Sequence, residues 1–119
     1  MGQGERDRGK LLAGLKPALS DERYAFEATD RSALDADMFG LLREEEGLTA
    51  IRVSPSGAWA RISLGAYSSL DAVGLTAALS NALAVAGISA NVVAALNHDH
   101  IFVPWDRRID ALRAIEGLA

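Results

Sequence analysis

The two histidines of this chain, His98 and His100, lie two residues apart with Asp99 between them. Imidazoles at this spacing on a strand point to the same side, where a carboxylate could complete a metal site or orient a histidine as a general base. The chain has no third histidine and no cysteine, and no serine stands in a nucleophile-elbow pattern. Because His98 and Asp99 fall in a predicted tight turn, where short polar side chains cap the backbone, we expect a structural hairpin or an interface here, without metal or catalysis.

A second polar site begins at Ser68, directly after a predicted strand. Ser68, with Asp71 three residues later, fits the capping box that starts a helix. The first turn of a helix has unpaired N–H groups and partial positive charge, so it can hold a carboxylate or a phosphate. Gly74 lacks a side chain in the second predicted turn, which would let a ligand or a neighbouring backbone come close. An ordinary capped helix whose glycine fits against the sheet is the simpler explanation of the same residues.

Two more places could contact a ligand or a partner. Asn91 lies among apolar neighbours in a predicted central strand, where a buried amide needs a hydrogen-bond partner from a ligand or from the backbone. Trp59, Arg61 and Ser63 share one face of a strand, and a face without helices that carries Trp59 would be a natural dimer surface. The three glutamates at positions 44–46 are predicted to form a solvated turn, although they could attract a cationic ligand.

Composition excludes several functional classes. Half of the 119 residues are hydrophobic, which is enough for one domain, or two small lobes on a shared core, without metal or disulfides. The net charge is −4 and the basic residues are scattered, so nucleic acid is not an expected partner. The N-terminal residues lack the apolar core of a signal peptide, and the apolar stretch 75–86 is too short to cross a bilayer. We expect a cytoplasmic protein with no membrane partner and no cofactor.

The elements that must position these residues follow from the apolar pattern. In the first half, a mobile tail over residues 1–9 precedes a short helix limited by Pro17, with leucines at 11, 12, 15 and 19. Three strands then follow, at residues 24–29, 38–43 and 48–53, with a loop or a helical turn at 30–37 and a turn at 44–47. The loop at 54–57 separates the halves, and it is too short to link independent domains.

The second half predicts the order strand, helix, strand, strand, helix. Residues 59–64 alternate between apolar and polar faces, and the helix that follows carries an apolar stripe before Gly87 ends it. The stripe consists of Leu75, Leu79, Ala82, Leu83 and Ala86. Residues 89–96 predict a strand buried on both faces, which turns at 97–99 and returns at 101–103. Asp106 is the predicted N-cap of a last helix, with Ile109, Leu112 and Ile115 inward and Gly117 at its end.

This order is the ferredoxin-like pattern without its final strand. A strand of the first half could supply the missing edge, which would give two interleaved lobes. We therefore predict an α+β sandwich, in which an antiparallel sheet carries its helices on one face.

Three blocks of sequence also resemble a known family. They are SLDAVGLTAA at residues 69–78, AGISANVVA at 86–94 and HDHIFVP at 98–104. In these blocks the chain resembles the small, stand-alone bacterial ACT-domain proteins of unknown function. That family is similar to the tandem ACT regulatory region of aspartate kinases and to the ACT lobes of a eukaryotic arginine sensor. The match spans residues 59–116, and residues 24–26 and 46–49 extend it more weakly.

The resemblance implies a ferredoxin-like ACT fold, often dimeric and used elsewhere to sense amino acids. Residues 10–57 would form a partial N-terminal ACT-like lobe, and residues 58–119 a C-terminal ACT lobe. The ligand would lie where the first strand–helix turn of one ACT unit faces the next unit. Carried onto this sequence, the contacts are Ser68, Ser69, Leu70, Asp71, Val73 and Gly74 from the turn, and Asn91 and Val92 from the facing strand. Two tyrosines usually precede the His-Asp-His block in this family, and Leu96 and Asn97 stand in their place here.

The sequence therefore predicts a non-enzymatic regulatory protein, most simply a homodimer, that binds a small metabolite such as an amino acid. Family membership determines the fold better than the ligand, because one fold serves many ligands. The first alternative is an interaction module that binds no ligand and works through the face of Trp59. The second alternative is a metal-dependent enzyme built on His98 and His100.

Overall fold

The computed structural model describes residues 14–65 and 74–118, which form one antiparallel sheet and two helices. In chain order the elements are β1 (Pro17–Thr29), β2 (Met38–Glu44), β3 (Gly47–Val53), β4 (Trp59–Leu64), α2 (Leu75–Val85), β5 (Asn91–Ala94), β6 (Asp99–Pro104), the 3-10 turn η1 (Trp105–Arg107) and α3 (Arg108–Glu116). The strand order across the sheet is β2-β3-β1-β4-β6-β5. The predicted α+β class with an antiparallel sheet is confirmed.

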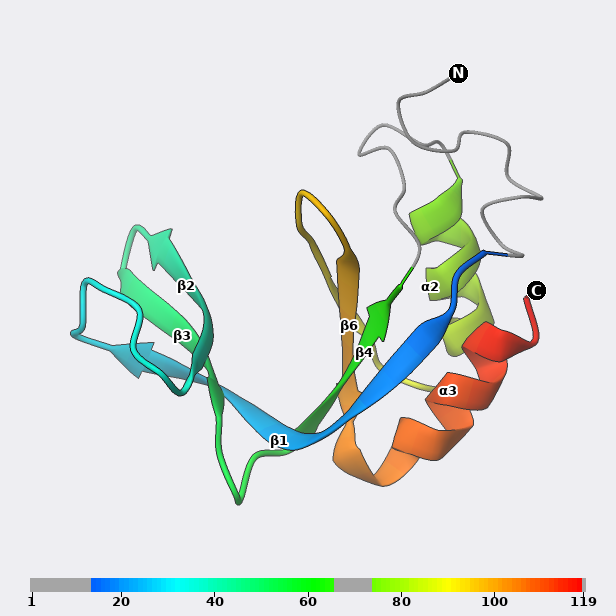
Figure 1. Ribbon diagram of the computed structural model, residues 1–119, viewed down its shortest axis with the longest axis horizontal. Coiled ribbons are helices and arrows are strands. Elements are labelled where there is room, and N and C mark those ends of the chain that lie inside the picture. The colour runs from blue at the N-terminus through cyan, green and yellow to red at the C-terminus, as the bar shows by residue number, and fades with distance from the viewer. Residues whose placement is uncertain (1–13, 66–73, 119) are drawn as a thin grey trace.

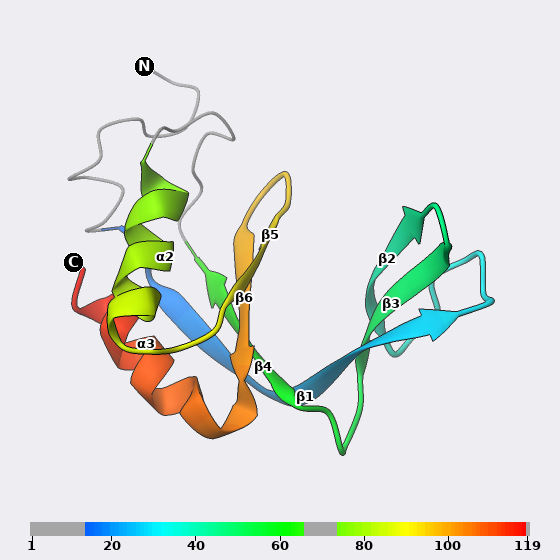
Figure 2. The same ribbon diagram turned by 180° about the vertical axis from the view of Figure 1, so that it is seen from behind.

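The long strand β1 joins the two halves of the sheet. Its first part pairs with β4 and its second part pairs with β3, and the register with β4 shifts between Leu19 and Arg23. Such a bulge bends a strand and increases its twist. Figures 1 and 2 show the result: β2 and β3 lie at one end of β1, and β4, β6 and both helices lie at the other. The sheet is therefore strongly curled rather than flat.

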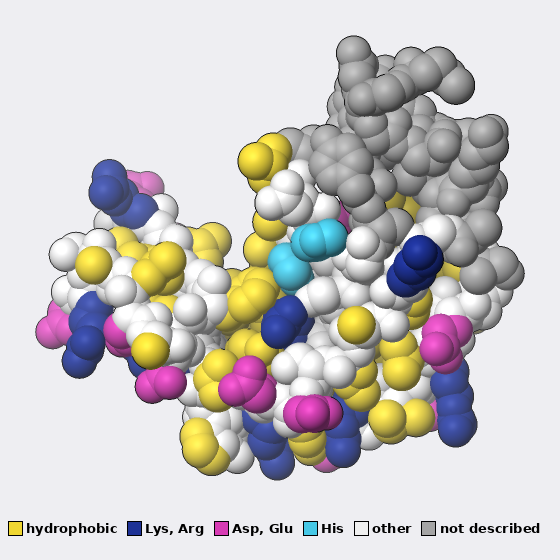
Figure 3. Space-filling model, in the orientation of Figure 1, with side chains coloured by type: hydrophobic (Ala, Val, Ile, Leu, Met, Phe, Trp, Pro, Cys, Tyr) yellow, Lys and Arg dark blue, Asp and Glu magenta, His cyan; other side chains and the backbone are white. Residues whose placement is uncertain are grey.

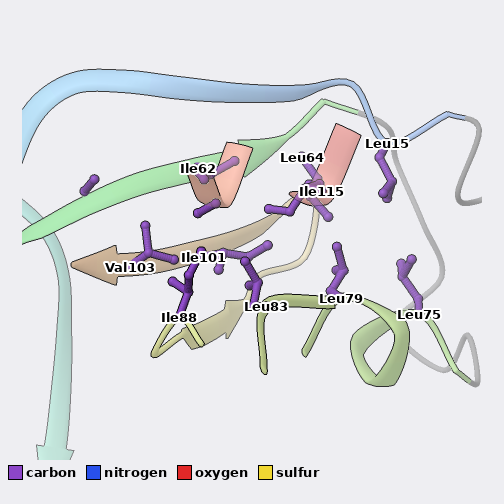
Figure 4. Packing of buried hydrophobic residues seen from close by; sticks show 12 residues of the cluster. Leu15, Ile62, Leu64, Leu75, Leu79, Leu83, Ile88, Ile101, Val103 and Ile115 are labelled. Carbon is purple, nitrogen blue, oxygen red and sulfur yellow. The ribbon is translucent and has the colours of Figure 1, made fainter. Parts of the chain in front are cut away.

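The main core lies between the helices and one face of β4 and β6. On β4 the residues Ala60, Ile62 and Leu64 are buried, as their alternation predicts, and α2 contributes a buried stripe. Figure 4 shows these side chains meeting those of Ile88, Ile101, Val103 and Ile115. Helices on one face of the sheet, as predicted from the sequence, are confirmed (Figures 1 and 2).

A second cluster covers the opposite face of β4 and β6, which we call the inner face. Tyr24, Ile51 and Phe102 are buried there, and Phe39 and Trp59 pack against them. The Phe102 ring meets the ring of Tyr24 at 5.5 Å and that of Phe39 at 5.6 Å, edge to face, between centroids. Because Phe39 at the start of β2 reaches Phe102 and His100 of β6, the chain itself covers part of the face that the sequence offered to a second subunit.

The prediction of a short helix before β1 is wrong at Leu19. That residue lies in β1, pairs with Ile62 of β4 and packs against the main core. The leucine spacing fits a helix, but pairing with β4 is a tertiary interaction that local spacing does not report. Pro17 starts the strand rather than limiting a helix, which a strand tolerates at its first position. Residues 1–13, including the predicted tail, lie outside the described residues.

The prediction for residues 89–96 is also wrong in part. Only Asn91–Ala94 form a strand, and this strand is the edge of the sheet, paired with β6 alone. Asn91 is exposed, and Leu96 is 71% exposed. A run of valine and alanine predicts a strand, but it does not indicate how many neighbouring strands the fold provides.

The last helix, α3, does not start as the sequence predicts. Asp106 lies in η1, and the residue that caps α3 is Arg107 rather than Asp106. Ile115 is buried and Leu112 packs against the core, as predicted, whereas Ile109 is 45% exposed and not inward as predicted. Ala111 takes the remaining buried position of the helix.

Candidate functional site

The start of α2 is the site that the sequence predicts for a ligand. Ser68, Ser69, Leu70, Asp71 and Val73 lie outside the described residues, so their predicted contacts stay predictions. Gly74 is the N-cap of α2, with φ of 92°, and its carbonyl accepts a hydrogen bond from the amide of Ala78. Gly74 therefore precedes the helix, instead of lying in its second turn as predicted. Its left-handed backbone is one that glycine adopts easily and other residues adopt at a cost.

The facing residues Asn91 and Val92 lie beyond the other end of α2. Asn91 starts β5 and is exposed, so the predicted buried amide is wrong, while Val92 packs against the main core. In Figure 4, Leu75, the first residue of α2, and Ile88, which follows the helix, lie at opposite ends of the packed cluster. One chain therefore does not bring Gly74 and Asn91 together.

The histidine hairpin is ordered by backbone and side-chain hydrogen bonds. The Ala95 amide donates to the His98 carbonyl at 3.1 Å and closes the turn before β6. The predicted hairpin turn is present, but Asp99 lies in β6 rather than in the turn. His98 is exposed, whereas Asp99 and His100 are half-buried. Burial raises the pKa of the Asp99 carboxyl, and the charge of His98 opposes that change. Within residues 14–65 and 74–118, no three histidine, aspartate or glutamate side chains come close enough to form a metal site.

Hydrogen bonds connect His100 to two other candidate residues on the inner face. The Ser63 hydroxyl lies 2.7 Å from Nδ1 of His100, and Nη1 of Arg61 donates to the Ser63 oxygen at 2.5 Å. Nε of Arg61 donates to the Tyr24 hydroxyl at 2.9 Å. We call Arg61, Ser63, His100 and Tyr24 the Arg61 cluster. The sequence placed Arg61 and Ser63 on one face of β4, but Tyr24 was missed.

Phe39 of β2 covers the Arg61 cluster from the other half of the sheet. Its ring centroid lies 4.8 Å from that of His100, and the Arg61 guanidinium carbon lies 4.7 Å from it. Burial lowers the pKa of His100, and the charges of Arg61 and His98 lower it further. The imidazole is therefore neutral near pH 7.

Trp59 occupies the rim of the inner face. It is half-buried, and its ring meets that of Phe26 at 5.9 Å between centroids. Phe26 is 37% exposed. Because side chains of the same chain already cover part of Trp59, the surface that remains for a second subunit is smaller than the sequence suggested.

Two further features of the described residues bear on function. A surface depression on the side of β2 and β3 is lined by Ser32, Leu41, Arg43 and Leu48, which offer one guanidinium and one hydroxyl among leucines. Neither α2 nor α3 is long and apolar enough to cross a membrane.

Protein-family models and solved structures both match this chain. A family model described as an ACT domain matches residues 56–117, and a second ACT-domain model matches residues 3–60. A search of curated proteins finds no match. Among solved structures, the chain is similar to a protein of unknown function from Vibrio cholerae, described as a possible transport protein. The two are 36% identical over 93% of this chain and 94% of that chain, with a TM-score of 0.81.

Two more distant structures share the fold. A protein from Agrobacterium tumefaciens is 18% identical over 87% of this chain and 88% of its own, with a TM-score of 0.64. The ligand-free regulatory subunit of aspartate kinase from Thermus thermophilus is 12% identical over 88% of this chain and 98% of its own, with a TM-score of 0.65. At these identities the likeness shows the fold alone.

Proposed function

This chain belongs to the ACT-domain family, and on that basis we propose that it is a non-enzymatic regulatory protein that binds a small metabolite, most plausibly an amino acid. ACT domains are regulatory rather than catalytic, and many of them bind amino acids. The observation that carries the proposal is the match of two successive ACT-domain models to the two halves of the chain. We propose that residues 10–57 act as a partial lobe and residues 58–119 as a complete one.

The proposed ligand site is the turn that contains Ser68, Ser69, Leu70, Asp71, Val73 and Gly74. Backbone N–H groups at the start of a helix suit a carboxylate, and α2 has no acidic residue in its first turn to compete for them. The left-handed Gly74 supports this proposal, because a glycine there leaves the helix start without a β-carbon.

The facing strand, with Asn91 and Val92, is proposed to come from a second copy of the chain. The two ends of α2 are separated by 11 residues, a length of about 16 Å at the usual rise per residue, so a single chain does not close the site. An isologous dimer would present Asn91 of each copy to Gly74 of the other. Ligand binding would then shift the dimer equilibrium or the packing of the lobes.

A thermal-shift screen of the free amino acids tests the proposal, with a few nucleotides and divalent metals included. A ligand at a hundred times its Kd adds about 2.7 kcal/mol to the free energy of unfolding, which raises Tm of a domain this size by several degrees. One selective amino acid, with a change in light-scattering mass, would support a dimeric sensor. A response to metals alone would instead favour His98 and His100, and no response would favour an interaction module.

Replacement of Gly74 by valine tests whether the ligand binds at the start of α2. We expect the affinity for the amino acid identified in the screen to fall roughly tenfold or more, a loss of about 1.4 kcal/mol or more of binding free energy, measured by calorimetry. Gly87→Ala is the matched control, because Gly87 also has a positive φ, of 73°, at the other end of the same helix, and no atom lies within 4 Å of the added β-carbon. Equal affinity in a folded Gly74→Val protein would exclude this site.

A further inference from the structure

The Arg61 cluster joins three strands of the inner face through one line of hydrogen bonds. Arg61 on β4 donates to Tyr24 of β1 and to Ser63 of β4, and Ser63 contacts His100 of β6. Ser63 and His100 are directly opposite each other in the antiparallel register. The antiparallel pairing therefore places the guanidinium and the imidazole side by side, although 39 positions of sequence separate them.

The charge of Arg61 has only neutral partners among the described residues. A guanidinium stays protonated in proteins, and a partly buried charge normally acquires a counter-ion. Arg52 of β3 illustrates the usual case, with Glu27 at 3.0 Å and Asp35 at 3.3 Å. Within residues 14–65 and 74–118, no carboxylate lies within 4 Å of Arg61. The inner face thus carries a positive charge that no carboxylate of the described residues neutralises.

The hydrogen bonds among the described residues leave donors of Arg61 and His100 that a ligand could use. The Ser63 oxygen accepts a hydrogen bond from Arg61 and lies 2.7 Å from Nδ1 of His100, and we assign its hydroxyl hydrogen to Nδ1. The neutral imidazole then carries its proton on Nε2, as a donor. Arg61 has five N–H donors, of which Nε–H and one on Nη1 are used. The remaining donors lie on Nη1 and Nη2, the pair that binds a carboxylate in bidentate fashion.

We propose that the inner face of the curled sheet binds a small organic carboxylate through Arg61 and His100. Figure 3 shows the histidines at the wall of the hollow between the two halves of the molecule. Phe39, at 4.7 Å from the guanidinium carbon, would pack on the apolar part of the ligand. A single positive charge beside a neutral imidazole matches a monoanion better than a doubly charged phosphate. This site is built from other residues than those proposed for the ligand site, which are Gly74 and the residues before it, so it goes beyond the proposed function.

Anion binding at this site is linked to the protonation of His100. Among the residues that the structure describes, the titratable groups near His100 are Arg61 of β4, His98 and Asp99 of the hairpin, and Tyr24 of β1, which is bonded to Arg61. The β2 strand contributes Phe39, which does not titrate. A bound carboxylate opposes the effect of the Arg61 charge, so it raises the pKa of His100. By linkage, the carboxylate binds more tightly as the pH falls through that pKa.

NMR titration with sodium acetate tests the site, with sodium chloride and sodium phosphate as comparisons at equal ionic strength. We expect acetate to shift the Arg61 Nε–Hε signal and the His100 ring nitrogens saturably, to raise the pKa of His100, and to bind more tightly than phosphate. Arg61→Gln should weaken acetate binding about tenfold or more, because hydrogen bonds to charged groups are strong. Arg113→Gln on α3 is the control, since it removes the same charge from an exposed position on the helix side.

Three outcomes would overturn the proposal. These are equal shifts with acetate and chloride, equal loss of acetate binding in the Arg61 and Arg113 variants, and tighter binding of phosphate than of acetate. If Arg61→Gln does not fold, Ser63→Ala provides the test, because it keeps the charge and removes the hydroxyl that fixes the His100 tautomer. A His100 ring that responds to acetate in Ser63→Ala as it does in the parent protein would contradict the site; a lost response would support it.

Discussion

At the scale of single residues, Gly57 shows how tightly the loop between the two halves is packed. Gly57 is buried against β1, and its carbonyl accepts a hydrogen bond from Nε of Arg23 at 2.8 Å. A β-carbon added at Gly57 would lie 2.3 Å from the carbonyl oxygen of Tyr24 and 2.8 Å from its backbone nitrogen. Backbone atoms of a central strand cannot move away cheaply, so this position requires glycine for space.

Gly57→Ala is therefore expected to lower the free energy of unfolding by about 3 kcal/mol or more. Gly40→Ala on β2 is the matched control, because the added carbon would meet only Ile51 Cδ1, at an ordinary 3.7 Å. In a strand, alanine is expected to be neutral or to stabilise by about 0.5 kcal/mol relative to glycine. Urea unfolding of both variants checks the prediction, and equal stabilities would contradict it.

At the scale of elements, α2 owes its position to its buried face rather than to its capping. No side chain caps its start, and no basic residue lies in its last turn. Leu79 and Leu83 have no exposed surface, whereas Val85 on the same helix is 81% exposed. The helix is therefore held mainly by hydrophobic contacts with β4 and β6.

Leu83→Ala should consequently destabilise the protein by about 2–5 kcal/mol, through lost contacts and the cavity that remains. Val85→Ala deletes apolar atoms that are already exposed to solvent on the same helix. We therefore expect its free energy of unfolding to change by no more than about 0.5 kcal/mol. Thermal unfolding with both variants compares the two faces. Comparable losses would mean that Val85 is covered in solution, for example by another subunit.

At the scale of the whole molecule, the curl of the sheet determines the environment of the inner face. The register of β1 with β4 shifts at a bulge, and Phe39 at the start of β2 packs on the His100 ring and helps to remove it from water. Burial is the largest cause of the lowered pKa of His100. The pKa of His100 therefore reports how closely the two halves of the molecule pack.

The stability of the protein should for this reason depend on pH. Because the pKa of His100 is lower in the folded state than its ordinary value of 6.5, the unfolded chain binds the proton first. The stabilising contribution is complete above pH 6.5 and is lost as the pH falls below it. Urea unfolding between pH 7.5 and 5.5 measures the loss. We expect this loss of stability on acidification to be smaller in Phe39→Ala, because that change exposes His100, and to be absent in His100→Gln.

An identical pH dependence in the parent protein and in His100→Gln would contradict this assignment. Asp99 contributes to the pH dependence with the opposite sign. Burial raises the pKa of its carboxyl, so its unfavourable effect is relieved as the pH falls towards the acidic range. His100→Gln keeps Asp99, so the difference between this variant and the parent protein isolates the contribution of His100.

The sequence by itself determined the elements whose pattern is local. The alternation of residues 59–64 predicted β4 and its buried face, the leucine stripe predicted the body of α2, and the polar turn predicted the hairpin before β6. Each pattern reports on which side of its own element a residue lies, because a strand repeats every two residues and a helix every 3.6. The resemblance to ACT domains added the family, but not the ligand.

Only the tertiary structure decided which elements are neighbours. It assigned Leu19 to a strand by pairing it with β4, exposed Asn91 at the edge of the sheet, and united Arg61, Ser63 and His100 in one cluster. These relations depend on strand order, register and the bulge in β1, which involve residues far apart in the chain. Periodicity carries no information about such pairing, because the same strand pattern suits a central strand and an edge strand alike.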